Sequence, residues 1–270
     1  MPQCKVFNLE MHGKVVHVEL NRPDKLNAMG ADFWEEISEI FAWIEQEDAV
    51  RAVVMSGAGK HFCSGIDLAY LGSVAGLLGK DPGRNARVLR EQIKRLQAAL
   101  HAVDQCSKPV LAAIHGYCIG GAVDLISACD MRYCSDDAQF SIKEIDLGMA
   151  ADVGTLQRLP HLIGDGILRE LAYTGRFVGA SEAERIGLVN RTYVSREEML
   201  GAVLEMAQEI AGKSPLAVRG TKQMIRYMRS HSVEDGLEYV AIWNAAMLQS
   251  EDLRKAIAAQ MTKVTPEFDD

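Results

Sequence analysis

The chain has 270 residues, of which 48% are hydrophobic, so it can bury a substantial core and is not a disordered or fibrous protein. Its formal net charge of −8 provides no general excess of positive charge to attract a phosphate backbone, which argues against nucleic acid as a partner.

The first half of the chain predicts strands that alternate with helices. A strand-like N-terminal stretch leads into a β-branched run over 15–20, and a turn at 21–29 follows. Residues 31–47 have the apolar spacing of a helix, and 49–57 return to a strand. A glycine-containing loop comes next, then a polar passage over 72–85 that we expect to be mobile, and a helix over 86–105.

The second half begins with a buried strand over 108–116 and a helix over 120–130. Strand-like segments at 131–135 and 138–144 precede short helices over 153–187. After residue 196 the strand signals end and four helical stretches follow. Their apolar faces exceed what one helix leaves in water, so they either meet another subunit or cover the chain's own sheets.

The six cysteines form no C-x-x-C pair and have no histidine at zinc-finger spacing, so we expect reduced thiols and no metal site. No apolar run reaches the length of a membrane span, and the C-terminus does not match a peroxisomal S-K-L address. These features predict a soluble cytoplasmic protein that is not associated with a membrane.

Two glycine loops could hold an oxyanion. In the first, the backbone N–H of Gly121 lies where a buried strand enters a helix, and helix N-termini attract negative charge. In the second, the N–H of Ile66 could point at the same oxygen, and two such donors form an oxyanion hole. The alternatives are a tight strand–helix junction at Gly121 and an ordinary turn in which Asp67 caps a helix. His61 is expected to be a surface or packing histidine.

Three carboxylates in apolar stretches are candidates for proton transfer. They are Asp124, Glu144 and Asp152, and partial burial would raise their pKa values toward neutrality. Asp152 could instead be the N-cap of a helix that begins near Val153.

Five motifs in order resemble the enoyl-CoA hydratase/isomerase (crotonase) superfamily: "NRPDKLNAM", "HFCSGIDL", "KPVLAAIHGYCIGGAVDLISACD", "TLQRLPHLIG" and "LAVRGTKQMI". Within it, the stretch "GGAVDLISACDMRYCSDDAQFSIKEIDLGMAADVGTLQRLP" is most similar to the dienoyl-CoA isomerases, because Asp152 stands where hydratases commonly have glycine. The resemblance implies an α/β fold, a spiral of β-β-α units over 1–195, with a C-terminal helical trimerisation region over 196–270. It also implies a homo-oligomer, a trimer or a dimer of trimers.

The same resemblance implies an acyl-CoA substrate, with no other cofactor because coenzyme A is part of that substrate. Glu144 would take a proton from C2, Asp152 would return one at C6, and Asp124 would support them, while the amides of Ile66 and Gly121 hold the thioester oxygen. The residues implied to bind substrate are Lys25, Ser64, Gly65, Ile66, Asp67, Leu68 and Gly121, although Lys25 could equally be a solvated loop lysine. Three alternatives stay open. They are a 2-enoyl-CoA hydratase that uses Asp124 and Glu144, a Δ3-Δ2 monoene isomerase, and a non-catalytic RNA-binding member of the superfamily.

Overall fold

The structure, a computed structural model, describes residues 1–269 and is built on a six-stranded sheet. Its order is β1-β2-β3-β4-β6-β9, in which β1 is antiparallel to β2 and the other pairs are parallel. The strands are β1 (Phe7–His12), β2 (Val15–Leu20), β3 (Ala52–Gly57), β4 (Val110–Ile114), β6 (Met131–Ser135) and β9 (Arg191–Tyr193).

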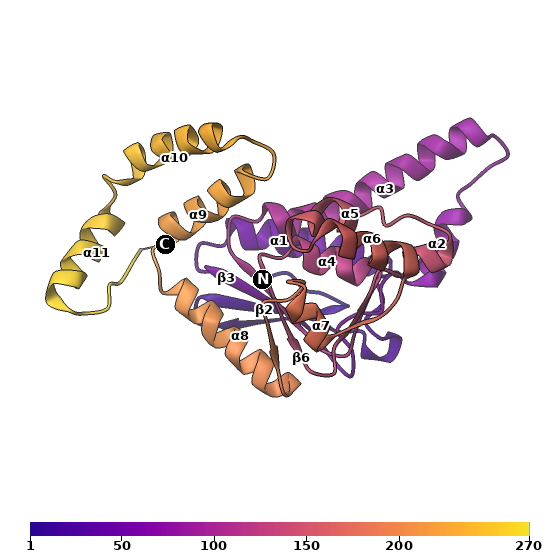
Figure 1. The fold of residues 1–270 in the computed structure, drawn as a ribbon, viewed down its shortest axis with the longest axis horizontal. Coiled ribbons are helices and arrows are strands. Elements are labelled where there is room, and N and C mark those ends of the chain that lie inside the picture. The colour runs from indigo at the N-terminus through magenta and orange to yellow at the C-terminus, as the bar shows by residue number, and fades with distance from the viewer. Residues whose placement is uncertain (270) are drawn as a thin grey trace.

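Helices cover both faces of this sheet, so its central strands are buried throughout (Figure 1). Val53 and Met55 of β3 belong to the main core, together with α1 (Ala31–Gln46), α3 (Pro82–Gln105) and α4 (Gly121–Ala128). Ala52 and Val54 point the other way and pack with Val203 of α8 (Arg196–Ala211). The continuous apolar runs of β3 and β4 follow from this double covering.

A second, three-stranded sheet lies beside the first and has the order β5-β7-β8. Its strands have only two or three residues each: β5 (Tyr117–Ile119), β7 (Gln139–Ser141) and β8 (Val178–Gly179). The remaining elements of the core are α2 (Leu68–Ala75), α5 (Thr155–Arg158), α6 (Asp165–Thr174), α7 (Ala180–Arg185) and the 3-10 turns Pro23–Lys25, Lys143–Leu147 and Leu159–His161.

Most of the elements expected from the sequence are confirmed, with three differences. The passage over 72–85 is partly helical, because α2 runs to Ala75 and α3 begins at Pro82, where Asp81 accepts a hydrogen bond from the Arg84 amide at 2.9 Å. The strand expected over 138–144 stops at Ser141, so Glu144 lies on a 3-10 turn. The pairing of β5 with β7 was not expected.

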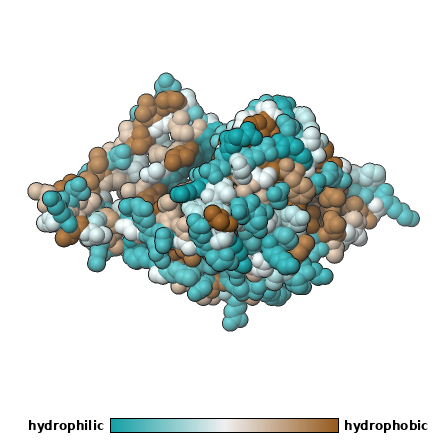
Figure 2. All heavy atoms as spheres, turned by 60° about the horizontal axis from the view of Figure 1, so that its bottom comes forward, coloured by the Kyte–Doolittle hydropathy of each residue, from teal (hydrophilic) through white to brown (hydrophobic). Residues whose placement is uncertain are grey.

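The four C-terminal helices expected after residue 196 are present, but they behave differently. Only α8 packs on the sheet; α9 (Pro215–Tyr227), α10 (Val233–Met247) and α11 (Glu251–Thr262) form an arm that extends away from it (Figure 1). Apolar surface runs along this arm (Figure 2), including Leu237, Ile242 and Leu248, each 60–63% exposed. The arm therefore does not cover the chain's own sheet. The domain boundary near residue 195 stays a prediction.

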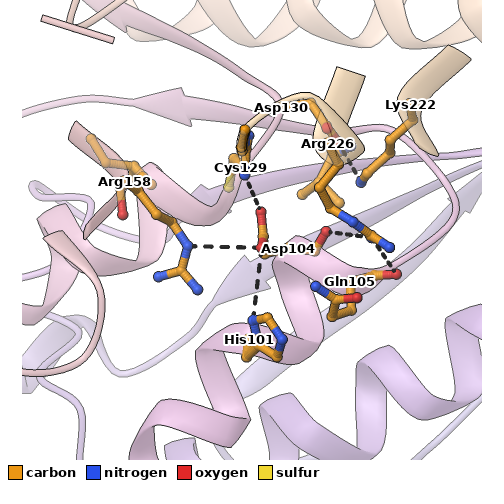
Figure 3. Close-up of polar contacts among 12 residues, drawn as sticks. His101, Asp104, Gln105, Cys129, Asp130, Arg158, Lys222 and Arg226 are labelled. Atoms are coloured by element: carbon orange, nitrogen blue, oxygen red, sulfur yellow. Dashed lines mark hydrogen bonds and ion pairs between the residues drawn. The ribbon is translucent and has the colours of Figure 1, made fainter. Parts of the chain in front are cut away.

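Polar contacts anchor the base of this arm to the core (Figure 3). Lys222 of α9 is buried, and its ammonium group lies 2.6 Å from Asp130 Oδ2 and donates to the Lys108 carbonyl at 2.9 Å. Arg226 donates to the Asp104 and Gln105 carbonyls at the end of α3. These bonds fix the direction in which the arm leaves the core.

Candidate active site

The two glycine loops lie against each other at the edge of the small sheet. Backbone hydrogen bonds join them, from the Cys63 amide to the Tyr117 carbonyl at 2.9 Å and from the Ile119 amide to the Cys63 carbonyl at 3.1 Å. Gly65 has a φ of 89°, and a Cβ there would lie 2.5 Å from the Ile119 carbonyl oxygen. Only glycine allows this close approach of the loops.

The contact brings the two candidate oxyanion donors together. A Cβ built on Gly121 would lie 3.8 Å from the Ile66 nitrogen, and one on Gly65 would lie 3.4 Å from the Gly121 nitrogen. Within residues 1–269, neither the Ile66 nor the Gly121 N–H donates to a protein acceptor. Gly121 is also the first residue of α4, where N–H groups have no partner in the helix.

A cavity of about 360 Å³ opens beside these two amides. Its wall includes every residue that the resemblance implied for substrate binding, and Glu144: Lys25, Ser64, Gly65, Ile66, Asp67, Leu68, Gly121 and Glu144. The structure thus brings the oxyanion candidates and the candidate base to one cavity.

Glu144 reaches the cavity from the 3-10 turn Lys143–Leu147. Its carboxylate packs over Gly120, whose missing Cβ would lie 3.2 Å from Oε1. Oε2 is buried and has no hydrogen-bond partner among the described residues. Burial raises the pKa of Glu144, and the nearby charge of Asp152 raises it further. A carboxylate held in this way is suited to accept a proton from a substrate near neutral pH.

Asp124 is fully buried on the first turn of α4, close enough to Glu144 for their charges to interact. Oδ1 accepts a hydrogen bond from the Thr155 amide at 2.5 Å, whereas Oδ2 has no partner among the described residues. Burial, followed by the charge of Glu144, raises the pKa of Asp124 to about 7. Sequence reasoning did not identify Thr155, which holds this carboxyl group in place.

The raised pKa of Asp124 predicts a pH-dependent loss of stability. Because the folded state holds this proton more tightly than the unfolded chain, its stabilising effect is complete below the unfolded pKa near 3.8 and is lost as pH rises to about 7. At about 1.4 kcal/mol per pKa unit over about three units, the free energy of unfolding should fall by up to about 4 kcal/mol. Urea unfolding at pH 5 and pH 8 covers about two of these units and should show a fall of about 2.7 kcal/mol.

Asp124→Asn provides the comparison, because asparagine keeps the oxygen that accepts from Thr155 and cannot ionise. The variant should be more stable than the unsubstituted protein at pH 8 and should lack this part of the pH dependence. If the free energy of unfolding changed equally with pH in the two proteins, Asp124 would not titrate in this range.

Asp152 does not cap a helix, which corrects one of the two sequence interpretations. The helix α5 begins at Thr155, with Gly154 as its N-cap residue. The backbone carbonyl of Asp152 accepts a hydrogen bond from Gln97 of α3 at 2.7 Å. Although the residue is exposed in the isolated chain, partial burial of its carboxyl group raises its pKa.

Asp152 also faces a different cavity from the one expected. It lies on the wall of a cavity of about 690 Å³ between α3 and α5, with Arg158 and His161, and it does not line the cavity of Glu144. The charge of Asp152 nevertheless raises the pKa of both Glu144 and Asp124. The three acids are therefore electrostatic neighbours, although Glu144 and Asp152 line different cavities.

Two further residues have local structural roles. Asp67 is the N-cap of α2, where it accepts from the Ala69 amide at 2.9 Å, and it pairs with Arg22 at 3.1 Å. This confirms the capping interpretation. His61 stacks on Tyr117 with the ring centroids 4.3 Å apart, and its Nδ1 accepts from the Tyr117 amide, as expected for a packing histidine.

Sequence reasoning missed Lys143, which lies on the wall of the Glu144 cavity. Its ammonium group donates to Asp146 at 2.7 Å and to the Gly175 carbonyl at 2.9 Å. Only its position next to Glu144 could have indicated it.

The fold and the paired glycine loops are those of an enzyme of the crotonase type, and comparisons with known proteins agree. The enoyl-CoA hydratase/isomerase family matches residues 10–270, and the chain belongs to this family. It is 52% identical to the peroxisomal Δ(3,5)-Δ(2,4)-dienoyl-CoA isomerase of Arabidopsis thaliana over 98% of this chain and 96% of that protein. It is 51% identical to the mitochondrial Δ(3,5)-Δ(2,4)-dienoyl-CoA isomerase of Rattus norvegicus over 92% of this chain and 77% of that protein.

A solved structure shows the same fold. The enoyl-CoA hydratase of Bacillus anthracis superposes with a TM-score of 0.89 at 30% identity, over 98% of this chain and 99% of that one. The expected crotonase-like α/β fold is confirmed.

Proposed function

We propose that the chain is a Δ3,5-Δ2,4-dienoyl-CoA isomerase that acts in fatty-acid β-oxidation. The observation that carries the proposal is the cavity in which two unpaired backbone amides, of Ile66 and Gly121, face the same space as the carboxylate of Glu144. The chain is 52% and 51% identical in sequence to two proteins named for this reaction, which supports the choice of substrate.

The proposed reaction moves one proton and two double bonds. The thioester oxygen accepts hydrogen bonds from the two amides, which stabilises the negative charge that develops when Glu144 removes a proton from C2. The electron pair of the C2–H bond enters the conjugated system and gives a dienolate. Protonation at C6 by Asp152 then converts the C3=C4 and C5=C6 bonds into C2=C3 and C4=C5 bonds.

The raised pKa values suit this exchange of protons. A raised pKa brings each of the two carboxyl groups closer to neutrality, where it can exchange protons, and the proposal assigns the base to Glu144 and the acid to Asp152. The thioester end of the substrate occupies the 360 Å³ cavity and the C6 end extends toward Asp152. Asp124 supports Glu144 from behind, and Lys25 and Leu68 contact the coenzyme A portion. The chemistry requires no metal ion or redox cofactor.

The exposed apolar surface of α9–α11 supports assembly into a homo-oligomer, a trimer or a dimer of trimers, with residues 196–270 as the oligomerisation region. None of the helices in residues 1–269 has the length and apolar character to cross a membrane. The relatives carry peroxisomal and mitochondrial names, which do not favour the cytoplasmic location expected from the sequence.

A paired assay tests the proposed activity. Purified protein incubated with a 3,5-dienoyl-CoA should produce the strong ultraviolet absorbance of a conjugated 2,4-dienoyl thioester, and it should hydrate crotonyl-CoA far more slowly. Hydration without the diene shift would instead identify a 2-enoyl-CoA hydratase that uses the adjacent acids Asp124 and Glu144. Retention of RNA with no turnover of either thioester would indicate the non-catalytic alternative.

A further inference from the structure

A histidine–carboxylate cluster lies on the β1–β2 hairpin, where the proposed chemistry does not use it. Glu10 and His17 are direct partners in the antiparallel register, so their side chains are cross-strand neighbours on one face. His12 is two residues from Glu10 on the same strand and therefore points to the same face. One ligand atom from each of the three side chains lies within 4.8 Å of the other two.

We propose that Glu10, His12 and His17 form a binding site for a divalent transition-metal ion, with Zn²⁺ as the reference ion. Two imidazole nitrogens and one carboxylate oxygen form a donor set that Zn²⁺ accepts, at bond lengths of about 2.0–2.2 Å. Tetrahedral ligands at these lengths are roughly 3.4 Å apart. The three ligand atoms therefore have to approach one another by up to about 1.4 Å to reach that spacing.

The state of His12 supports the assignment. Its Nε2 is buried from solvent and has no hydrogen-bond partner among the described residues, although Glu10 Oε2 lies 3.5 Å away. A buried ring nitrogen without a partner is costly. A metal ion between His12 and Glu10 would satisfy both groups.

His17 is already oriented by a second partner. Its Nε2 forms a hydrogen bond with Ser56 Oγ at 2.8 Å, and Nδ1 has no hydrogen-bond partner within residues 1–269. A bond of this kind to the second ring nitrogen commonly fixes the orientation of a metal-ligating histidine.

The charges and the space around the cluster are compatible with a bound cation. Arg196, whose positive charge acts on His17, is paired with Glu19 at 3.3 Å and donates to the Gly57 carbonyl at 2.9 Å. A cavity of about 600 Å³ reaches Glu10 and His17 and leaves room for water at a fourth coordination position. This cavity shares no lining residue with the 360 Å³ cavity, so the ion would join the edge strand β1 to β2 and would not take part in isomerisation.

Calorimetric titration of the EDTA-treated full-length protein with Zn²⁺ tests the site. We expect one Zn²⁺ per chain and a rise in melting temperature, because an ion that binds only the folded state stabilises it. Loss of an outer-shell partner alone weakens metal sites by about 10–100-fold, so Ser56→Ala should fall in that range. Removing a ligand should weaken binding by more than Ser56→Ala does, because it takes away a bond to the ion itself.

Glu10→Gln is the main variant, because Glu10 is exposed and its replacement leaves the core unchanged. His12→Ala should have the same effect, and His231→Ala, which removes an exposed histidine of the arm, should bind Zn²⁺ like the unsubstituted protein. Diene isomerisation should be unchanged in all three. The proposal would be overturned if the unsubstituted protein bound no Zn²⁺ below about 1 mM. It would also be overturned if Glu10→Gln and His12→Ala bound Zn²⁺ as tightly as the unsubstituted protein.

Discussion

Replacing Glu144 with glutamine should lower kcat for the diene shift by about 10²–10⁴-fold, the usual contribution of a positioned acid or base. Glutamine fills the same space over Gly120 but cannot accept the C2 proton. The variant should also lose exchange of the C2 hydrogens with solvent deuterium, because that exchange requires the same proton removal. Absorbance of the conjugated product and proton NMR of the thioester in D₂O measure the two effects.

Asp146→Asn provides the matched control. Asp146 lies on the same 3-10 turn, is exposed, and pairs with Lys143 at the surface. Its replacement should leave both the diene shift and the C2 exchange within about twofold of the unsubstituted protein, since exposed ion pairs contribute little. If Glu144→Gln kept full exchange at C2, another group would be the base and the proposed mechanism would be wrong.

The parts of the fold that the sequence predicted are those with long, regular apolar patterns. The helix at Ala31–Gln46 buries one face, and the strands at Ala52–Gly57 and Val110–Ile114 are buried on both faces, so each pattern is strong. The small sheet was not predicted, because the two residues of β8 and the three of β5 are too few to show a period. Tertiary pairing with β7 determines those strands.

In the site, too, local sequence patterns predicted some features, whereas others depend on tertiary contacts. The glycine loops could be predicted, because Gly65 and Gly121 each follow a strand and leave backbone N–H groups available. The burial of Asp124 and its bond to the Thr155 amide depend on two segments 31 residues apart, and no local pattern encodes them. The cluster of Glu10 and His17 was missed for a related reason, since only the hairpin register brings these residues together.

Asp152 presents the sharpest test, because its carboxyl group faces a cavity that Glu144 does not line. Asp152→Asn should lower the rate of the diene shift by about 10²–10⁴-fold, since asparagine has the shape of the protonated acid but cannot give a proton to C6. Exchange of the C2 hydrogens with deuterium should continue at a rate close to that of the unsubstituted protein. Glu144 and the amides of Ile66 and Gly121, which carry out that step, are unchanged.

This separation distinguishes the two acids in a way that a loss of activity alone cannot. Glu144→Gln should stop both the exchange and the diene shift, whereas Asp152→Asn should stop only the second. Asp165→Asn, which changes an exposed acid on the first turn of α6, controls for a general effect of lost surface charge. A diene shift at the normal rate in Asp152→Asn would mean that C6 takes its proton from water or from Asp124, and the two-acid mechanism would then fail.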